Sequence, residues 1–349
     1  MQDLEQNFID KIQNFTILPR RFNLKSNKIH LFGPPKSGKT SLALDFAKRF
    51  KKPAYIDCND PRTDIESIKP LLLKLYLEKK IDILIVDNFH DSFSLPNLEN
   101  VILITSSQNI NVSKNFLSKA IEPLSFEEYI SFDKKNLSIN ALFNHFLKDG
   151  NLPEIQYLNE YQKIPRKQEI IFLALNSNAR LFQNIIPYQA HKITINQIYT
   201  QIKKQNKISK DKIYECINEF QATKTIYFLP HKEDKSKSKK LYFYDFSLPY
   251  AFMSIKSFHA IFENMIFLEL LGKNQTLFYD EGCDFLTQDS CAYIALAFPT
   301  QEMIEEKIAK IQKKFSLITI ITINYEYERK TPYGKWKAVS FINFALGES

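Results

Sequence analysis

The stretch GPPKSGKT, Gly33 to Thr40, combines residue types and a spacing that suit the binding of phosphate groups. A short apolar run, KIHLF, precedes it, and SLALDFAKRF, which has helical spacing, follows it. Its two glycines let the backbone turn N–H groups towards phosphate oxygens, and the helix start adds the positive end of its dipole. We expect Lys39 to reach the β- and γ-phosphates of ATP, and the Thr40 hydroxyl to bind Mg²⁺. The predicted nucleotide-binding residues are Gly33, Pro34, Pro35, Lys36, Ser37, Gly38, Lys39, Thr40 and Ser41.

A second stretch, ILIVDN, places a carboxylate at the end of an apolar run. Asp87 suits the metal shell that accompanies a phosphate-binding loop, although a strand-end aspartate can also cap a turn. The next residue is Asn88, where a hydrolase usually carries a glutamate. An amide hydrogen-bonds a water molecule but does not accept its proton near neutral pH. Asp91, in the loop that follows, is a weak substitute, so the sequence predicts firm ATP binding and slow ATP hydrolysis.

Hydroxyl groups end a third apolar stretch, NVILITSSQ, at residues 100–108. Thr105, Ser106 and Ser107 either sense the γ-phosphate and orient the attacking water, or are ordinary hydroxyls at the start of a loop. We include Ser106 and Ser107 with Asp87 and Asn88 as candidate catalytic residues.

Apolar runs at residues 28–32, 54–58, 81–89 and 100–108 alternate with helical patterns, one of them over residues 64–80. Near-continuous apolar strands predict an α/β fold whose parallel sheet is buried on both faces. Ligands of such sheets bind beyond the carboxyl ends of the strands. The glycine-rich stretch, Asp87 and the hydroxyl group of residues 105–107 all fall at those ends.

The bulk composition is that of a globular protein. The chain has 349 residues with 44% hydrophobic and 25% charged residues, and a net charge of +8. That charge fits a phosphate-bearing partner or simply a lysine-rich coding bias. No run of eighteen or more apolar residues predicts a membrane span, and the N-terminus lacks the pattern of a secretory signal. The scattered cysteines, which form no CxxC pair, fit a reducing cytoplasm. An oligomer is compatible with the sequence but not indicated by it.

Residues 165–247 change in character. Residues 193–205 suggest one helix, and a second follows with Ser209 as its N-cap. TIYFLP and KLYFYDF read as two strands around the lysine-rich tip HKEDKSKSKK. This order predicts a winged helix that either contacts double-stranded DNA or serves as a packing module.

The candidate DNA-contacting residues are Lys210, Lys212, Lys235, Lys237, Lys239 and Lys240. Because Glu215 and Glu219 share the second helix and arginine is absent, we expect phosphate contacts with little sequence preference.

Residues 248–349 begin with an apolar helix and continue with strand-like stretches, of which the last, KAVSFINFAL, is expected to close a sheet. This order of elements resembles the restriction-nuclease-like fold. Glu263, in an apolar helix, and Asp284, in a strand, match the first two positions of its metal site. The third position falls in AYIALAF, where Ala295, Leu296 and Ala297 offer neither a ligand nor a lysine. Metal-assisted cleavage needs a held ion and an activated water. We therefore expect a degenerate nuclease site, with Glu263 and Asp284 as structural remnants or surface carboxylates.

Taken in order, seven stretches resemble the AAA+-like ATPases of bacteria and archaea that carry a winged helix and a C-terminal domain of restriction-nuclease ancestry. The stretches are LFGPPKSGKTSL, YIDC, ILIVDN, VILITSS, EPLSFEEYI, DGNLPEI and LYFYDFSL. The resemblance implies that Lys39, Thr40 and Asp87 bind Mg-ATP and that a helical lid runs from Leu124 to about Glu154. It also implies that Ser106 and Ser107 lie in the sensor segment of the family.

This chain departs from the family pattern in two places. Asp87-Asn88 stands where the family usually has Asp-Glu. Ser118-Lys119 stands nearest the place where many relatives have Gly-Arg, which removes the basis for an arginine finger.

The predicted domains are an ATPase core (1–124), a helical lid (125–164), a winged helix (165–247) and a degenerate nuclease-like domain (248–349). The favoured hypothesis is a slowly hydrolysing Mg-ATP-binding protein that associates with DNA through its last two domains. The alternative is a nucleotide-gated module that binds a protein partner and no nucleic acid. An ATP-dependent nuclease ranks last.

Overall fold

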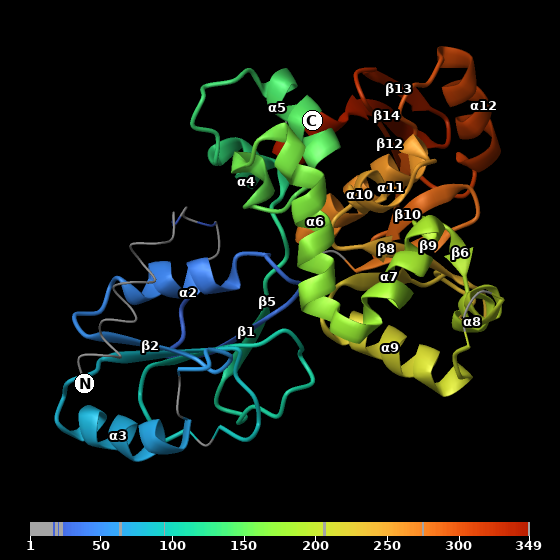
Figure 1. Cartoon of the computed structure of the whole chain (residues 1–349). Helices are drawn as coiled ribbons and strands as arrows, with labels where there is room; N and C mark the ends of the chain where they lie inside the picture. The colour runs from blue at the N-terminus through green and yellow to red at the C-terminus, as the bar shows by residue number, and fades with distance from the viewer. Residues whose placement is uncertain are drawn as a thin grey trace. The chain divides into compact units, whose positions relative to one another are not determined.

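The computed structural model describes residues 17, 20, 24–62, 65–93, 95–204, 207–273 and 276–347. The chain divides into an N-terminal unit of residues 1–122 and 222–225 and a C-terminal unit of residues 123–221 and 226–349 (Figure 1). The finer division expected at residues 125–164, 165–247 and 248–349 stays a prediction.

A five-stranded sheet in the order β2-β3-β4-β1-β5 forms the centre of the N-terminal unit. Every neighbouring pair of strands is parallel, which confirms the predicted parallel sheet. The strands are β1 (Lys28–Phe32), β2 (Pro53–Asp57), β3 (Ile83–Asp87), β4 (Val101–Ile104) and β5 (Leu117–Ala120). Helices α2 (Lys39–Ala47) and α3 (Ile65–Leu77) lie on opposite faces of the sheet (Figure 1). Asp64, the predicted start of α3, lies outside the described residues.

Strand β3 shows why its sequence is apolar throughout. Ile83 and Ile85 pack into the core that contains α2, whereas Leu84 and Val86 pack into the core that contains α3. Successive side chains of a strand point to opposite faces, so a strand covered on both faces needs an apolar residue at every position. Asp87 is the first polar residue of β3, and it lies at the carboxyl end, where the residues that follow β1 also begin.

Helices open the C-terminal unit. The side chains of Ser125 and Glu128 form a capping box at the start of α4, and Ser138 caps α5. These side chains satisfy helical N–H groups that have no partner within the helix. The helices are α4 (Phe126–Ser131), α5 (Ile139–Asp149), α6 (Glu160–Leu175), α7 (Ala179–Ile185), α8 (Ile195–Lys203), α9 (Lys210–Ala222) and α10 (Leu248–Phe252). Short 3-10 turns lie at Ile155–Tyr157, Asn176–Asn178 and Ile186–Tyr188.

Helices α8 and α9 precede the last two strands of a small antiparallel sheet in the order β6-β8-β7. Its strands are β6 (Lys192–Ile193), β7 (Ile226–Leu229) and β8 (Lys239–Phe243). The Ser209 hydroxyl accepts a hydrogen bond from the Lys212 N–H at 3.2 Å, as expected for the N-cap of α9. Strand β6 has no counterpart in the sequence analysis, because two residues show no alternation of apolar and polar side chains.

Strand β8 is bonded along both of its edges. Strand β7 pairs with one edge, and β6 pairs with the first residues of the other edge. Beyond β6, a side chain continues the pairing. The Asn264 carboxamide accepts a hydrogen bond from the Phe243 N–H at 2.8 Å and donates one to the Phe243 carbonyl at 2.9 Å. Strand β8 is thereby bonded directly to the helix that carries Asn264.

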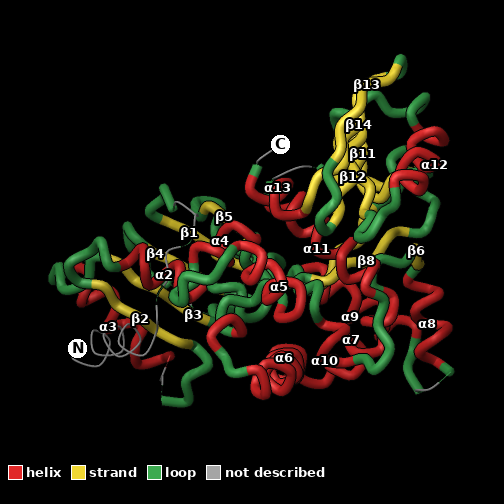
Figure 2. Tube along the Cα trace, turned by 90° about the horizontal axis from the view of Figure 1, so that it is seen from above, coloured by secondary structure: helices red, strands yellow, loops and turns green. Residues whose placement is uncertain are grey.

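A six-stranded mixed sheet, in the order β13-β14-β12-β11-β10-β9, completes the C-terminal unit. Strand β10 runs antiparallel to both of its neighbours, β9 and β11, and β12 is parallel to β11. The strands are β9 (Leu277–Asp280), β10 (Cys283–Thr287), β11 (Cys291–Ala295), β12 (Leu317–Thr322), β13 (Tyr327–Thr331) and β14 (Gly334–Ser340). Helix α12 (Gln301–Ile311) lies on one side of this sheet, and α11 (Phe258–Gly272) and α13 (Phe341–Leu346) lie on the other (Figure 2).

The last apolar stretch, FINFAL, differs from its prediction. It was expected to close the sheet, but it forms helix α13. The Ser340 hydroxyl accepts a hydrogen bond from the Asn343 N–H and so starts the helix at the end of β14. Among the described residues, no helix has both the length and the apolar character that crossing a bilayer requires.

Candidate functional site

The residues between β1 and α2, which we call the glycine loop (residues 33–40), have an unusual backbone. Gly33, Lys36 and Gly38 have positive φ angles of 138°, 59° and 96°. Gly33 also packs so closely that a Cβ atom there would lie 2.6 Å from the Ile121 carbonyl oxygen. Gly38 precedes α2, and no side chain caps the helix. The loop therefore turns sharply and leads into helical N–H groups that no side chain caps, a geometry that attracts anions.

Lys39 lies at the start of α2, and its ammonium group is held by the loop itself. Its Nζ atom donates to the carbonyl oxygens of Gly33 at 2.8 Å and Pro34 at 2.7 Å. Burial lowers the pKa of Lys39 to about 8, although the charges of Asp87 and Glu122 act in the opposite direction. The ammonium group is thus positioned within the loop by weak acceptors that phosphate oxygens can replace.

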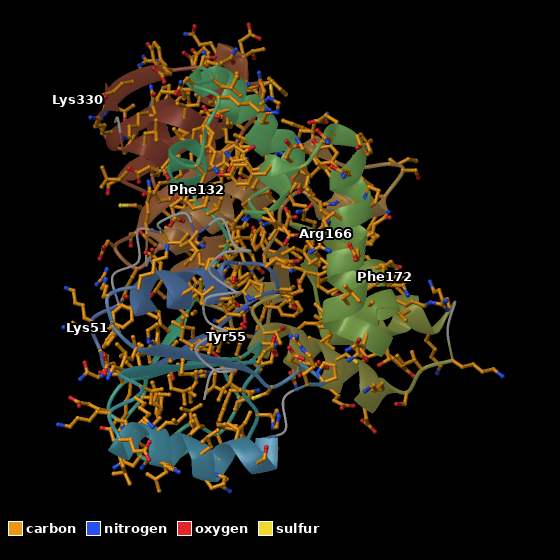
Figure 3. The ribbon with its side chains drawn as sticks, turned by 60° about the vertical axis from the view of Figure 1, so that its left-hand side comes forward. Lys51, Tyr55, Phe132, Arg166, Phe172 and Lys330 are labelled. Carbon is orange, nitrogen blue, oxygen red and sulfur yellow. The ribbon has the colours of Figure 1, made fainter. Side chains whose placement is uncertain are left out.

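Asp87 is buried and receives hydrogen bonds from several elements. Its Oδ2 atom accepts from the Thr40 hydroxyl at 2.7 Å and from the Tyr55 hydroxyl at 2.8 Å. Its Oδ1 atom accepts from the Asn88 N–H at 2.9 Å. Tyr55 lies on β2 (Figure 3), and burial followed by the charge of Asp87 raises the pKa of its hydroxyl. The tyrosine is therefore a neutral donor that fixes the carboxylate.

The donor set around Asp87 fits a hard divalent cation. Thr40 and Asp87 place a hydroxyl and a carboxylate oxygen 2.7 Å apart. Mg²⁺ prefers one or two such protein oxygens and takes its remaining ligands from phosphates and water. The buried Ser37 hydroxyl supports the presence of a further ligand, because it has no hydrogen-bond partner among the described residues.

Arg20 contributes to the glycine loop in a way that the sequence did not reveal. Its Nη1 atom donates to the Ser37 carbonyl at 2.6 Å, and its Nη2 atom donates to the Glu122 carbonyl at 3.0 Å. The guanidinium group thereby ties the loop to the residues that follow β5. No local pattern around Arg20 predicts these contacts, which join positions far apart in the sequence.

Asn88 stands next to a carboxylate from a different strand. Its side-chain amide donates to Asp57 Oδ1 at 2.8 Å, and the same oxygen accepts from the Asn59 N–H at 3.0 Å. Asp57 ends β2 and is half-buried, in register with Asp87 on β3. Asp57 is not among the predicted site residues, although an acid at the carboxyl end of the second strand was a visible signal. Asp91, the substitute considered there, instead accepts from the Asn111 N–H at 3.2 Å.

The three hydroxyls after β4 differ in their surroundings. Thr105 is buried, donates to the Ser107 carbonyl at 2.7 Å and lies 2.8 Å from His30 Nε2. The Ser107 hydroxyl accepts from the Asn109 N–H at 3.1 Å and so closes a turn. Ser106 is exposed. Of the two predicted sensor residues, Ser106 is the more accessible, and Thr105 has a structural role.

The predicted degenerate nuclease site is brought together in the C-terminal unit. Glu263 lies on α11 and Asp284 on β10, and the Nζ atom of Lys240 contacts both carboxylates, at 2.8 Å and 3.0 Å. The Ala295 backbone N–H donates to Asp284 at 2.9 Å. Burial alone would lower the pKa of Lys240, but Asp284 and Glu263 raise it, so the side chain is an ammonium ion.

Lys240 corrects one sequence prediction. It was grouped with the lysines that face DNA, but its side chain is buried against Glu263 and Asp284. The lysines that stay exposed are Lys210, Lys212, Lys235, Lys237 and Lys239.

Among the exposed lysines, some charges are compensated. Lys212 pairs with Glu215 at 3.1 Å, and Lys237 pairs with Glu281 at 2.8 Å. The positive surface near the tip between β7 and β8 is therefore smaller than the sequence suggested.

No protein-family model and no curated protein matches this chain. Among solved structures, it is similar to a Walker-type ATPase of Pyrococcus abyssi, with 13% identity over 70% of this chain and 93% of that chain, and a TM-score of 0.42. It is also similar to a signal transduction ATPase with numerous domains and a tetratricopeptide repeat sensor from Pyrococcus horikoshii, with 14% identity over 74% of this chain and 47% of that chain, and a TM-score of 0.31. The Orc1 protein of Aeropyrum pernix in complex with DNA shares 11% identity over 77% of this chain and 94% of that chain, with a TM-score of 0.30. At these TM-scores the likenesses carry no functional argument.

The pKa of Lys39 predicts proton uptake on nucleotide binding. The pKa of Lys39 is about 8 without nucleotide, and the negative charge of a bound triphosphate raises it. At a pH between these two values, Lys39 is therefore more fully protonated in the ATP-bound protein than in the free protein. We expect close to one proton taken up per ATP at pH 9, roughly 0.1 at pH 7, and an affinity that falls up to about tenfold per pH unit above 8. Calorimetric titration in two buffers of different ionisation enthalpy measures this uptake. Lys39→Arg is the control, because arginine stays protonated, and equal uptake at pH 9 by both proteins would contradict the assignment.

Proposed function

We propose that the N-terminal unit binds Mg-ATP at the glycine loop and hydrolyses it slowly. The observation that carries this proposal is the Thr40–Asp87 pair, a hydroxyl and a buried carboxylate 2.7 Å apart. Thr40 directly follows Lys39, the lysine of the glycine loop. Backbone N–H groups of the loop and of α2 hold the phosphates, and the Lys39 ammonium neutralises their charge. Bound Mg²⁺ supplies charge neutralisation at the phosphates, while Thr40 and Asp87 hold it.

Slow hydrolysis follows from the residues beside Asp87. Asn88 orients a water molecule but does not take its proton. Asp57 is the carboxylate in contact with Asn88, and we assign the remaining hydrolysis to it. Its Oδ1 atom already accepts two hydrogen bonds, from Asn88 and Asn59, and must give up one of them to approach a water molecule closely.

We further propose that the C-terminal unit associates with double-stranded DNA through phosphate contacts. The order of β6, α8, α9, β7 and β8 and the sheet order β6-β8-β7 support a winged helix. The exposed Lys235 lies at the tip between β7 and β8, and the exposed Lys239 is the first residue of β8, where a wing reaches the backbone of a duplex. Lysines bind phosphate without reading bases, so little sequence preference is expected.

A nucleotide-gated protein-interaction module is the alternative, and one observation favours it. Helix α6 exposes large apolar side chains, including Tyr161 at 76% and Leu173 at 66%, with Ile164 and Phe172 between them in the sequence. Figure 3 labels Phe172 on this helix. Exposed apolar side chains on one helix are typical of a surface that binds another protein. Under this alternative the same helix, and no lysine, determines the partner.

ATP binding is tested with Lys39→Ala. Losing a charged hydrogen-bond donor to phosphate costs ~1.5–3 kcal/mol, so the dissociation constant for Mg-ATP rises about 10- to 100-fold. Fluorescence titration with a labelled nucleotide measures it, with GTP as competitor to test the base. Lys48→Ala is the matched control, because Lys48 is a lysine just past the other end of α2, paired with Asp45. If Lys39→Ala bound ATP as tightly as the wild type, the assigned site would be wrong.

The basis of slow turnover is tested at Asn88, Asp57 and Asp91. Asn88 has a φ angle of 52°, which aspartate tolerates better than glutamate, so Asn88→Asp introduces a carboxylate with the least backbone strain. We expect Asn88→Asp to raise the ATPase rate about tenfold or more, and Asp57→Asn to lower it by a similar factor, since general bases contribute about 10²- to 10⁴-fold. Asp91→Asn is the control and leaves the rate unchanged. A loss of rate in Asp91→Asn with none in Asp57→Asn would reverse the assignment.

DNA association is tested by fluorescence anisotropy with a duplex at several salt concentrations. The affinity is expected to fall with salt, and the variant Lys235→Ala/Lys239→Ala to reduce the logarithmic slope by roughly 2, about one for each lysine that binds a phosphate. Lys310→Ala/Lys313→Ala removes two exposed lysines at α12 and is the matched control. Absence of binding at low salt, with and without Mg-ATP, would leave the protein-interaction alternative.

A further inference from the structure

The carboxylates of Glu263 and Asp284 both contact the same positively charged group, the ammonium group of Lys240. The side chains of Lys240, Glu263 and Asp284 expose only 8%, 4% and 16% of their surface. The lysine Nζ atom lies 2.8 Å from Glu263 Oε1 and 3.0 Å from Asp284 Oδ1. It bridges the two carboxylates, which is where an ion bound by both would lie.

We propose that the Lys240 ammonium group is the resident cation of the Glu263–Asp284 pair and closes this site to divalent metal ions. This inference is independent of ATP binding, because all three residues belong to the C-terminal unit. The expectation of a degenerate nuclease site rested only on the missing third ligand. The proposal adds that the Lys240 ammonium group occupies the place between the two remaining carboxylates.

Each of the four carboxylate oxygens has a partner. Glu263 Oε1 also accepts from the Tyr242 hydroxyl at 2.6 Å, and Glu263 Oε2 lies 3.5 Å from His259 Nε2. Asp284 Oδ2 accepts from the Ala295 N–H at 2.9 Å. A divalent ion needs several oxygen ligands at about 2.0–2.6 Å, so it can bind here only by displacing the ammonium group.

The surroundings of the pair make a cation necessary. Tyr242 stacks on Phe267 with ring centroids 4.3 Å apart, and Lys240 lies 5.9 Å from the centroid of the Phe285 ring. Two carboxylates among aromatic rings are costly when no positive charge compensates them. Removing the lysine therefore leaves a site whose negative charge favours the uptake of an external cation.

The alternation along β8 explains how the lysine reaches the site. Lys240 and Tyr242 point to one face of the strand and contact Glu263. Leu241 and Phe243 point to the other face and belong to the core of the helices before β7. The neighbouring Lys239 is exposed. Lys239 and Lys240 are thus adjacent in the sequence, but because successive side chains of a strand alternate between its faces, one is a surface lysine and the other a buried counter-ion.

The experiment is a titration with Mn²⁺ in the absence of nucleotide, followed by electron paramagnetic resonance and by thermal unfolding. Lys240→Ala is expected to bind Mn²⁺ at least about tenfold more tightly than the wild type, because an external ion replaces the lost ammonium group. Its melting temperature is expected to lie below that of the wild type without Mn²⁺ and to rise when Mn²⁺ is added. Lys239→Ala is the matched control, with the Mn²⁺ affinity and melting temperature of the wild type.

A second variant keeps the test decisive. Lys240→Ala/Asp284→Asn removes one ligand, and the gain in Mn²⁺ affinity is expected to disappear. If Lys240→Ala does not fold without metal, Lys240→Gln keeps a hydrogen-bond donor without the charge and is measured in its place. Equal Mn²⁺ affinity of the wild type and the folded Lys240 variant would overturn the proposal. Mn²⁺-dependent DNA cleavage by the wild type that is lost in Lys240→Ala would also overturn it, because the lysine would then serve a working metal site.

Discussion

Asp87 carries a negative charge into the interior of the N-terminal unit, and the elements around it are arranged to hold that charge. Thr40 at the start of α2 and Tyr55 on β2 each donate a hydroxyl to the same oxygen. Both donors are neutral, so neither of them compensates a negative charge on this oxygen. The sheet order places β4 between β3 and β1, so Asp87 and the glycine loop come from strands that are not neighbours. The site therefore depends on the sheet as a whole.

The C-terminal unit also buries negative charge, but it holds that charge with a positively charged group and not only with neutral donors. Its buried carboxylates, Glu263 and Asp284, are compensated by a full positive charge attached to β8. A site held by neutral hydroxyls leaves its charge available to a diffusible cation, whereas a site held by an ammonium group does not. The two units thus contain one buried carboxylate held by neutral hydroxyls and one pair of carboxylates held by a lysine of the chain itself.

The sequence predicted the parts of the structure that depend on local patterns. The glycine loop, the apolar β3 and the Ser209 cap follow from residue types at short spacing, because backbone geometry and burial act within a few residues. The contacts of Tyr55, Asp57 and Lys240 were missed, because they depend on which strands are neighbours and in what register. In the sequence, Lys240 resembles its exposed neighbours in a lysine-rich stretch, and only its position in the folded structure distinguishes it.

Local patterns also failed where an element was too short or too apolar to classify. Strand β6 has two residues, and FINFAL suits a strand and a helix equally until the Ser340 cap selects the helix.

Asn264 has a consequence for how β8 behaves in crowded solution. A strand edge with free N–H and C=O groups is a template on which another chain can add a strand, and such edges promote aggregation. Strand β6 is too short to cover β8, but the Asn264 carboxamide presents one acceptor and one donor to Phe243, as a further residue of a neighbouring strand would. One side chain from a helix thus completes the ladder. The strand that carries the buried lysine is protected against self-association without needing a longer partner.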